Sequence, residues 1–433
     1  MTDFSEFQQY LYDATDEKGR PSALVFATCD ADVVETARFC QEHRVALVPR
    51  GAGTGLSGGC VPSEGSVVLS TERMKKLEID VARKVARVGP GVITKDLQDE
   101  AEKHGLTYPP DPASYDESTL GGNVAENAGG LRCLRFGVTR DYVIGLKAVT
   151  MAGETMETGI YCETGGFGFE GLFIGAEGTL VIITEIAVRL TDIPGTGDTI
   201  LAAFDDPKDA AQTVSDITKA GITPTVMEYL DGDAADCSNR YEKTEGLDDV
   251  AAILLFETPA EDRVGCSRTI ESFCRKNQCS YIRVENDAKK AEHLWRVRRN
   301  LSKAVKELAS VRISEDVAVP NSKFPILVEF VAYLNRSSPL RINAFGHAGD
   351  GNLHVNFLSL TGDPDDSRLM EAGIEQLLRK TVELGGTLSG EHGIGLAKRR
   401  FLGLEFDPAT ISYMKGVKAV FDPGGLLNPG KIF

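Results

Sequence analysis

The sequence predicts an α+β protein of two domains, and three observations lead to this fold class. The chain has 433 residues, of which 42% are hydrophobic and 26% charged, so it is long and apolar enough for two ordinary hydrophobic cores. Its first half alternates apolar strands with amphipathic helices. Its second half mixes strands and helices without a strict strand–helix–strand repeat, which is typical of an antiparallel sheet with helices on one face.

The spacing of apolar residues places the elements of the first half. Residues 23–27 predict a strand, 31–43 an amphipathic helix, and 45–48 a second strand, which together form an α/β unit. The other elements predicted for this half are strands over 66–69, 84–88, 143–150 and 180–189, and a helix over 94–104.

A stretch with the composition of a linker, residues 191–198, separates the two halves. We therefore expect a first domain over residues 1–194, a second over 195–415, and a C-terminal tail over 416–433 that packs back onto the first domain. The second domain is predicted to contain strands over 199–204 and 251–257 and helices over 207–220, up to 274, and over 288–308.

Composition excludes several functions. A formal net charge of −17 argues against a nucleic-acid surface, because phosphate binding needs a basic face. No run approaches the roughly 18 apolar residues that cross a bilayer, and neither end has the pattern of a signal peptide, so we expect a cytoplasmic protein. The nine cysteines contain no CxxC pair, which favours reduced structural thiols over a zinc ribbon or an iron–sulfur cluster.

Three glycine-rich segments predict a site for one long ligand. They are PRGAGTGLSGG over 49–59, GGNVAENAGG over 121–130, and GAEGTL over 175–180. Glycine lets the backbone approach a diphosphate closely and tolerates positive φ, whereas the dinucleotide pattern GxGxxG with its acidic partner and the Walker pattern are both absent. One such loop could simply be flexible. Three in one domain, with the amides of Asn123 and Asn127, favour a ligand such as FAD.

Two short motifs predict a metal site. His347 and His354 lie in GHAGDGNLH, where the intervening glycines can make a turn that brings both imidazoles to one point. With Glu391 from SGEHG they form a set of two histidines and one carboxylate, which suits a zinc, iron(II) or manganese ion with open positions; Asp350 is an alternative carboxylate. His392 is then a candidate general base, or alternatively a hydrogen-bonding neighbour of the site.

These motifs, in this order, closely resemble those of the FAD-linked 2-hydroxyacid dehydrogenases. That family includes the glycolate oxidase large subunit, D-lactate dehydrogenase and D-2-hydroxyglutarate dehydrogenase, within the vanillyl-alcohol-oxidase flavoprotein superfamily. The resemblance covers nearly the whole chain and includes YPPDPAS, FGHAGDGNLHVN, GTLSGEHGIG and FDPGGLLNPGKIF. It implies a vanillyl-alcohol-oxidase-type FAD-binding domain and a cap domain with an antiparallel sheet and helices.

The resemblance also assigns residues to roles. His347, His354 and Glu391 match the metal ligands, and His392 matches the catalytic histidine. No counterpart of the histidine that tethers FAD covalently in distant relatives is evident near the glycine loop, so non-covalent FAD is expected. The residues that it places around FAD are Arg50, Gly51, Ala52, Gly53, Thr54, Gly55, Leu56, Ser57, Pro110, Gly122, Asn123, Asn127, Gly129, Gly178, Ile183 and Asn428.

The expected substrate is a small D-2-hydroxy acid, which the enzyme oxidises to a 2-oxo acid. Arg298 matches an arginine that holds the substrate carboxylate, although it could instead be a solvated charge on a basic helix face. Ser314 aligns with a lysine of the hydroxyglutarate-specific relatives, which favours D-lactate or glycolate.

Several alternatives remain at this point. They are D-2-hydroxyglutarate as substrate, a non-catalytic FAD-binding electron-transfer subunit, and a metal-dependent hydrolase. Because no cluster-forming cysteine set is present, electrons are expected to pass to a separate acceptor. An electron-transfer flavoprotein and an iron–sulfur subunit are both plausible from the resemblance, and quinone or oxygen are further possibilities.

Overall fold

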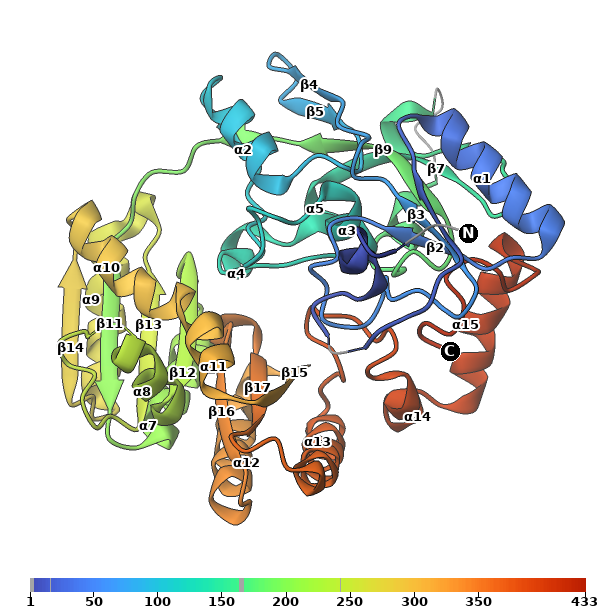
Figure 1. Cartoon of the computed structure of the whole chain (residues 1–433). Coiled ribbons are helices and arrows are strands. Elements are labelled where there is room, and N and C mark those ends of the chain that lie inside the picture. Colours follow the sequence, from blue (N-terminus) through green and yellow to red (C-terminus); the bar gives the residue numbers. More distant parts are fainter. Residues whose placement is uncertain (1–3, 16, 163–166, 242) are drawn as a thin grey trace. The chain divides into compact units, whose positions relative to one another are not determined.

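Figure 1 shows the computed structural model of the chain, which describes residues 4–15, 17–162, 167–241 and 243–433. Residue contacts divide the chain into two compact units. Unit 1 comprises residues 1–130, 137–193 and 391–433, and unit 2 comprises 131–136 and 194–390. None of the helices in the described residues is both long and apolar enough to span a membrane.

The chain returns to unit 1 at Glu391, earlier than the expected start of the tail at residue 416. The reason is local hydrogen bonding. The backbone amides of Ile394 and Gly395 donate to the carboxylate of Glu177 at 2.7 and 2.6 Å, so this segment is already part of the first unit. The short segment 131–136 contributes α4 (Cys133–Phe136) to unit 2, where Arg135 donates to the carbonyl of Thr223 at 3.3 Å.

Unit 1 begins with the predicted α/β motif. Strands β1 (Ala23–Phe26), β3 (Val67–Ser70) and β2 (Leu47–Arg50) form a parallel sheet in that order, and α1 (Asp30–His43) connects β1 to β2. The carboxylate of Asp32 accepts amides at the start of the helix. The three strands and the helix confirm the predictions within a few residues.

A second sheet of unit 1 is antiparallel and has the strand order β4-β5-β9-β7-β8. Buried residues of β5, β7 and β9 pack with α2 and α3 in one hydrophobic core. Part of the expected linker is in fact a strand, because β10 (Thr191–Asp192) pairs with β6 (Leu106–Thr107).

The remaining elements of unit 1 have these bounds: β4 (Leu77–Asp80), β5 (Val85–Val88), α2 (Thr94–Glu102), α3 (Leu120–Glu126), α5 (Thr139–Tyr142), β7 (Val143–Val149), β8 (Thr155–Glu157), α6 (Glu170–Phe173), β9 (Ile182–Arg189), α14 (Leu402–Glu405) and α15 (Pro408–Phe421).

Unit 2 is built on one antiparallel sheet of seven strands in the order β14-β11-β13-β12-β16-β17-β15 (Figure 1). The strands are β11 (Thr199–Phe204), β12 (Val226–Asp231), β13 (Ala252–Glu257), β14 (Tyr281–Glu285), β15 (Val311–Ala318), β16 (Arg341–Gly346) and β17 (Asn352–Ser359). The helices are α7 (Pro207–Lys219), α8 (Gly232–Tyr241), α9 (Arg263–Lys276), α10 (Ala288–Arg299), α11 (Leu301–Leu308), α12 (Phe324–Ser337) and α13 (Pro364–Glu383). The antiparallel sheet with helices confirms the predicted α+β class.

Helices cover both faces of this sheet, so the expectation of helices on one face was wrong. Neighbouring residues on a strand point to opposite faces. Tyr229 packs edge-on against Phe324 of α12, with ring centroids 5.7 Å apart, whereas Leu230 joins a core cluster with residues of α8, α10 and α11. Both faces are buried because β11, β12 and β13 are nearly continuous apolar runs, without the alternation of a half-exposed strand.

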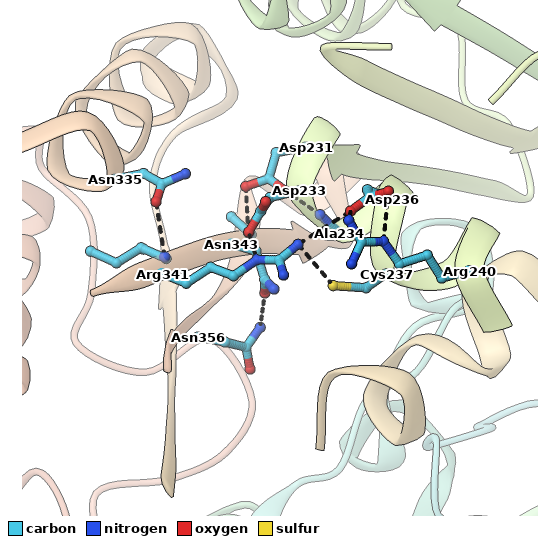
Figure 2. A network of polar contacts seen from close by, with 12 residues as sticks. Asp231, Asp233, Ala234, Asp236, Cys237, Arg240, Asn335, Arg341, Asn343 and Asn356 are labelled. Carbon is cyan, nitrogen blue, oxygen red and sulfur yellow. Dashed lines mark hydrogen bonds and ion pairs between the residues drawn. The ribbon is translucent and has the colours of Figure 1, made fainter. Parts of the chain in front are cut away.

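A polar network fastens α8 to the centre of the sheet (Figure 2). The carboxylate of Asp231, at the end of β12, accepts the amides of Ala234 and Ala344 at 2.8 and 2.6 Å. Arg341 of β16 donates to Asp233 of α8 at 2.6 Å, as the figure shows. Burial and the nearby charge of Asp233 raise the pKa of Asp231 to about 7, although the amide donors oppose this.

Candidate active site

A cavity of about 250 Å³ lies in unit 1, and all three predicted glycine-rich segments line it. The lining includes at least one glycine from each segment, among them Gly51, Gly122 and Gly178. At Gly51 a Cβ would lie 2.3 Å from the hydroxyl oxygen of Thr119, so only glycine lets the first segment approach the residues just before the second this closely. The residues of the predicted FAD set that line the cavity are Arg50, Gly51, Ala52, Gly53, Thr54, Gly55, Leu56, Gly122, Asn123, Gly129, Gly178 and Ile183.

The side chain of Arg50 donates hydrogen bonds to the N-terminal segment. Its guanidinium donates to the carbonyls of Gln9 and Tyr12, both at 2.7 Å, and it is buried. Asn123 is likewise buried and donates to the hydroxyl of Thr94 at 2.7 Å. These contacts fix the segments that carry the two residues.

Four residues of the predicted set do not line the cavity, and each supports the segments around it. Asn428 donates to the carbonyls of Gly59 and Glu177 at 2.8 and 2.9 Å, which ties together two segments that line the cavity. Asn127 caps α3 in the left-handed conformation, and its side chain accepts the amide of Arg140. The other two, Pro110 and Ser57, offer backbone carbonyls that accept a hydrogen bond from Gln98 and the amides of Leu396 and Ala397.

Two carboxyl groups that the sequence did not single out also line the cavity. Burial raises the pKa of Glu126 well above its ordinary value, and the neighbouring charges of Glu177 and Asp13 raise it further. Burial also raises the pKa of Glu177, but the amides of Ile394 and Gly395 oppose that effect. Glu126 therefore favours the protonated form, which can donate a hydrogen bond into the cavity. An acidic residue within each of two glycine-rich motifs was the available signal in the sequence.

Glu391 and His392 line the same cavity in unit 1. Glu391 lies beside the second glycine-rich segment, because a Cβ built on Gly129 would lie 2.6 Å from its Oε2 atom. The structure thus brings the proposed base His392 to the cavity formed by the glycine-rich segments.

His347 and His354 meet in unit 2, as the glycines between them predicted. The two rings are buried, with centroids 5.4 Å apart and planes at 87°. His347 directly follows β16, His354 is the third residue of β17, and Gly351 closes the turn between the strands at φ +71°. Asp350, the alternative carboxylate, is exposed and accepts the thiol of Cys133 at 2.9 Å. The assignment of both histidines as metal ligands stays a prediction.

Arg298 is buried in unit 2, so it is not a solvated charge on a helix face. Its Nε atom donates to Oε2 of Glu228 at 2.5 Å, and its guanidinium lies over the ring of Phe345 at 4.7 Å. Within the described part of the chain, its Nη atoms have no hydrogen-bond partner. The guanidinium fork therefore retains donors for an anionic ligand.

Glu228 is a residue of unit 2 that the sequence did not single out. It is fully buried on β12, and its Oε1 atom lies 2.5 Å from Nδ1 of His347 while Oε2 accepts from Arg298. Burial alone would raise its pKa, but His347 and Arg298 outweigh burial and lower the pKa of Glu228 to about 2. It is an ionised carboxylate that bridges a predicted metal ligand and the predicted substrate arginine.

Comparison with known families agrees with this geometry. Residues 173–432 match the family described as FAD linked oxidases, C-terminal domain, and residues 21–159 match the FAD binding domain family. The chain belongs to the FAD-linked oxidases. The predicted resemblance to a family of FAD-linked oxidoreductases is thereby confirmed.

Curated relatives match this FAD-linked oxidase over almost its whole length. The glycolate oxidase subunit GlcD of Bacillus subtilis is 40% identical and aligns over 98% of this chain and 92% of its own. D-lactate dehydrogenase of Anaerostipes hadrus is 33% identical over 99% and 92% of the two chains, and D-2-hydroxyglutarate dehydrogenase of Stutzerimonas stutzeri 35% over 100% and 96%. The solved structure of p-cresol methylhydroxylase, at 15% identity, has the same fold, with a TM-score of 0.80 over 99% of this chain and 92% of that one.

Proposed function

We propose that this FAD-linked oxidase is a dehydrogenase that oxidises a small D-2-hydroxy acid to the corresponding 2-oxo acid. The observation that carries the proposal is the cavity of unit 1, because the three glycine-rich segments that suit a long cofactor line it together with His392 and Glu391. A proton-accepting group in the cofactor cavity is what oxidation of an alcohol requires.

The residues of the cavity fit FAD. Glycines give close backbone approach, Asn123 lines the wall, and Glu126 supplies a buried carboxyl group that favours the protonated form. FAD held here would supply the acceptor for the hydride equivalent that leaves the carbon bearing the hydroxyl group. His392 accepts the proton of that hydroxyl group in the proposed reaction. Its place in the wall of the cavity, which a sequence pattern alone could not establish, supports this role.

A divalent metal, zinc, iron or manganese, belongs to the same proposal, with His347, His354 and Glu391 as ligands. The fit rests on unit 2, where the two imidazoles pack edge-on with centroids 5.4 Å apart. Nδ1 of His347 lies against Glu228, which leaves Nε2 as the ligand atom in this proposal. Such an ion would lower the pKa of the substrate hydroxyl group.

Arg298 is proposed to bind the substrate carboxylate through its Nη atoms, since Nε is held by Glu228. D-lactate or glycolate is the favoured substrate, because Ser314 stands where the hydroxyglutarate-specific relatives are expected to have a lysine. D-2-hydroxyglutarate is the second candidate, supported by the relative of that name that aligns with the whole chain.

Electrons are proposed to leave for a separate acceptor protein, such as an electron-transfer flavoprotein or an iron–sulfur subunit. The nine cysteines are free thiols scattered over both units, which supports an acceptor outside this chain.

Dye-linked turnover tests the proposal. Purified protein should contain about one FAD per chain and reduce an artificial acceptor with one of D-lactate, glycolate or D-2-hydroxyglutarate. Prolonged treatment with a chelator should abolish turnover without removing FAD, and zinc, iron(II) or manganese should restore it. Flavin-containing protein that is inactive with every acid would instead support a non-catalytic electron-transfer subunit, and protein without flavin would overturn the proposal.

A further inference from the structure

We infer that Glu228 is a positioning residue that aligns His347 for metal binding and Arg298 for substrate binding through one bridging carboxylate. The inference rests on the proposed function for the roles of these two partners. Glu228 itself touches neither FAD nor substrate in this scheme and acts through its two neighbours. The carboxylate of Glu228 is a fully buried charge that has no other role in the proposed reaction.

The contact with Glu228 orients the ring of His347. A carboxylate accepts hydrogen bonds and cannot donate them, so the 2.5 Å contact with Oε1 requires that Nδ1 of His347 carries the proton. The neutral ring then presents the lone pair of Nε2. Carboxylate partners of this kind fix the tautomer and the plane of metal-binding histidines, and their loss typically weakens metal binding 10- to 100-fold.

The same carboxylate orients the guanidinium of Arg298. Oε2 of Glu228 accepts from Nε at 2.5 Å, and the guanidinium stacks on Phe345 at 4.7 Å. These two contacts determine the plane of the guanidinium and leave its Nη atoms for the carboxylate of a substrate. The separation between Arg298 and His347 is therefore set by the width of a single carboxylate.

Glu228, the anchor of both side chains, lies on β12 within the sheet of unit 2. Leu230 pairs with Phe345, and Phe345 with His354, across β12, β16 and β17, so these side chains share one face of the sheet. Glu228 lies two residues before Leu230 and therefore on that face. Because the anchor lies within a sheet, its position is fixed before any ligand arrives.

Glu228→Gln is the decisive variant, because it keeps the size of the side chain but offers one acceptor oxygen in place of two. If the amide oxygen accepts from Arg298, its NH2 group faces Nδ1 of His347 and favours a proton on Nε2. If it accepts from His347, NH2 opposes the donor Nε of Arg298. Glu292→Gln is the matched control, because Glu292 is an exposed residue of α10 that pairs with Arg299.

The measurements are the ¹⁵N chemical shifts of the His347 ring in metal-free full-length protein and the dissociation constant for Mn²⁺. The chain has six histidines, and His347→Ala identifies the relevant signals. We expect Nδ1–H in the wild type and the control, and an increased Nε2–H population in Glu228→Gln. We also expect its Mn²⁺ dissociation constant to rise 10- to 100-fold, with the FAD spectrum unchanged.

Unchanged ring shifts, an unchanged Mn²⁺ dissociation constant and an unchanged KM for the hydroxy acid in folded Glu228→Gln protein would together overturn the inference and leave a purely structural ion pair. If that variant does not fold, Glu228→Asp keeps both oxygens one methylene further back and should give a smaller change in the same direction; wild-type values there would also overturn it. Wild-type protein that binds no Mn²⁺ and oxidises no hydroxy acid would refute the proposed function, whereas the ring shifts would still decide the role of Glu228.

Discussion

The turn between His347 and His354 can be tested by adding one methyl group at Gly351. This glycine has φ +71°, and a Cβ there would lie 1.9 Å from the carbonyl oxygen of Val319 and 2.9 Å from Oδ1 of Asn321. The first of these atoms belongs to the backbone and cannot swing away. Gly351→Ala should therefore displace the turn as well as strain it.

Two contributions determine how much Gly351→Ala lowers the free energy of unfolding. Alanine in the left-handed backbone conformation costs about 1–2 kcal/mol. Forcing its methyl group into packed structure adds about 1–3 kcal/mol. Gly351→Ala should therefore lower the free energy of unfolding by about 2–5 kcal/mol. Gly385→Ala is the matched control, because Gly385 has φ +78° in the same unit but no atom within 4 Å of the added Cβ. It should cost only about 1–2 kcal/mol.

Urea unfolding followed by the fluorescence of Trp295 is the appropriate assay. Trp295 is the only tryptophan of the chain and is buried in the core of unit 2, so its signal reports on the unit that contains both glycines. If the two alanine variants unfold at the same urea concentration, the close approach of Val319 does not constrain the turn and the reasoning fails.

Three further predictions concern the site and its support. His392→Ala should lower turnover about 10²- to 10⁴-fold while FAD stays bound, and near-normal turnover would remove His392 from the base role. Arg298→Lys should lower kcat/KM about 10- to 100-fold, mainly through KM, because lysine cannot hold Glu228 and a carboxylate in one plane; an unchanged KM would contradict the carboxylate contact. Asp231 has a folded pKa of about 7, above its unfolded value of 3.8, so its stabilising effect is complete below pH 3.8 and lost as the pH rises through 7. Asp231→Asn should therefore lose less stability than the wild type between pH 5 and 8 in urea unfolding, by about 1–4 kcal/mol, and parallel pH profiles would refute the assignment.

Much of the fold could be predicted from apolar spacing, because α1 and the strands of the first sheet have strong local patterns. Two features of unit 2 could not. A continuous apolar run such as β11 does not reveal whether one face or both are covered, and the predicted helix 288–308 divides into α10 and α11 at Asn300 without a glycine or proline to mark the break.

The residues of the candidate site, too, could be predicted only in part from the sequence. The glycines between His347 and His354 predicted a turn, and the structure brings both rings together. Glu228 gave no such signal, because it is 119 positions from His347 and lies within an ordinary apolar strand. The burial of Arg298 was hidden for a related reason, since its partner is known only once β12 and α10 are packed. Contacts between distant segments carry this information, and local sequence patterns do not.

In the proposed function a D-2-hydroxy acid reduces the flavin of this protein directly. Anaerobic absorbance of the purified protein should be followed while D-lactate, L-lactate, glycolate and D-2-hydroxyglutarate are added separately, before and after removal of metal by a chelator. We expect bleaching of the flavin bands by one of D-lactate, glycolate or D-2-hydroxyglutarate, no bleaching by L-lactate, and loss of bleaching after chelation. A flavin spectrum that no acid changes would contradict the proposed function.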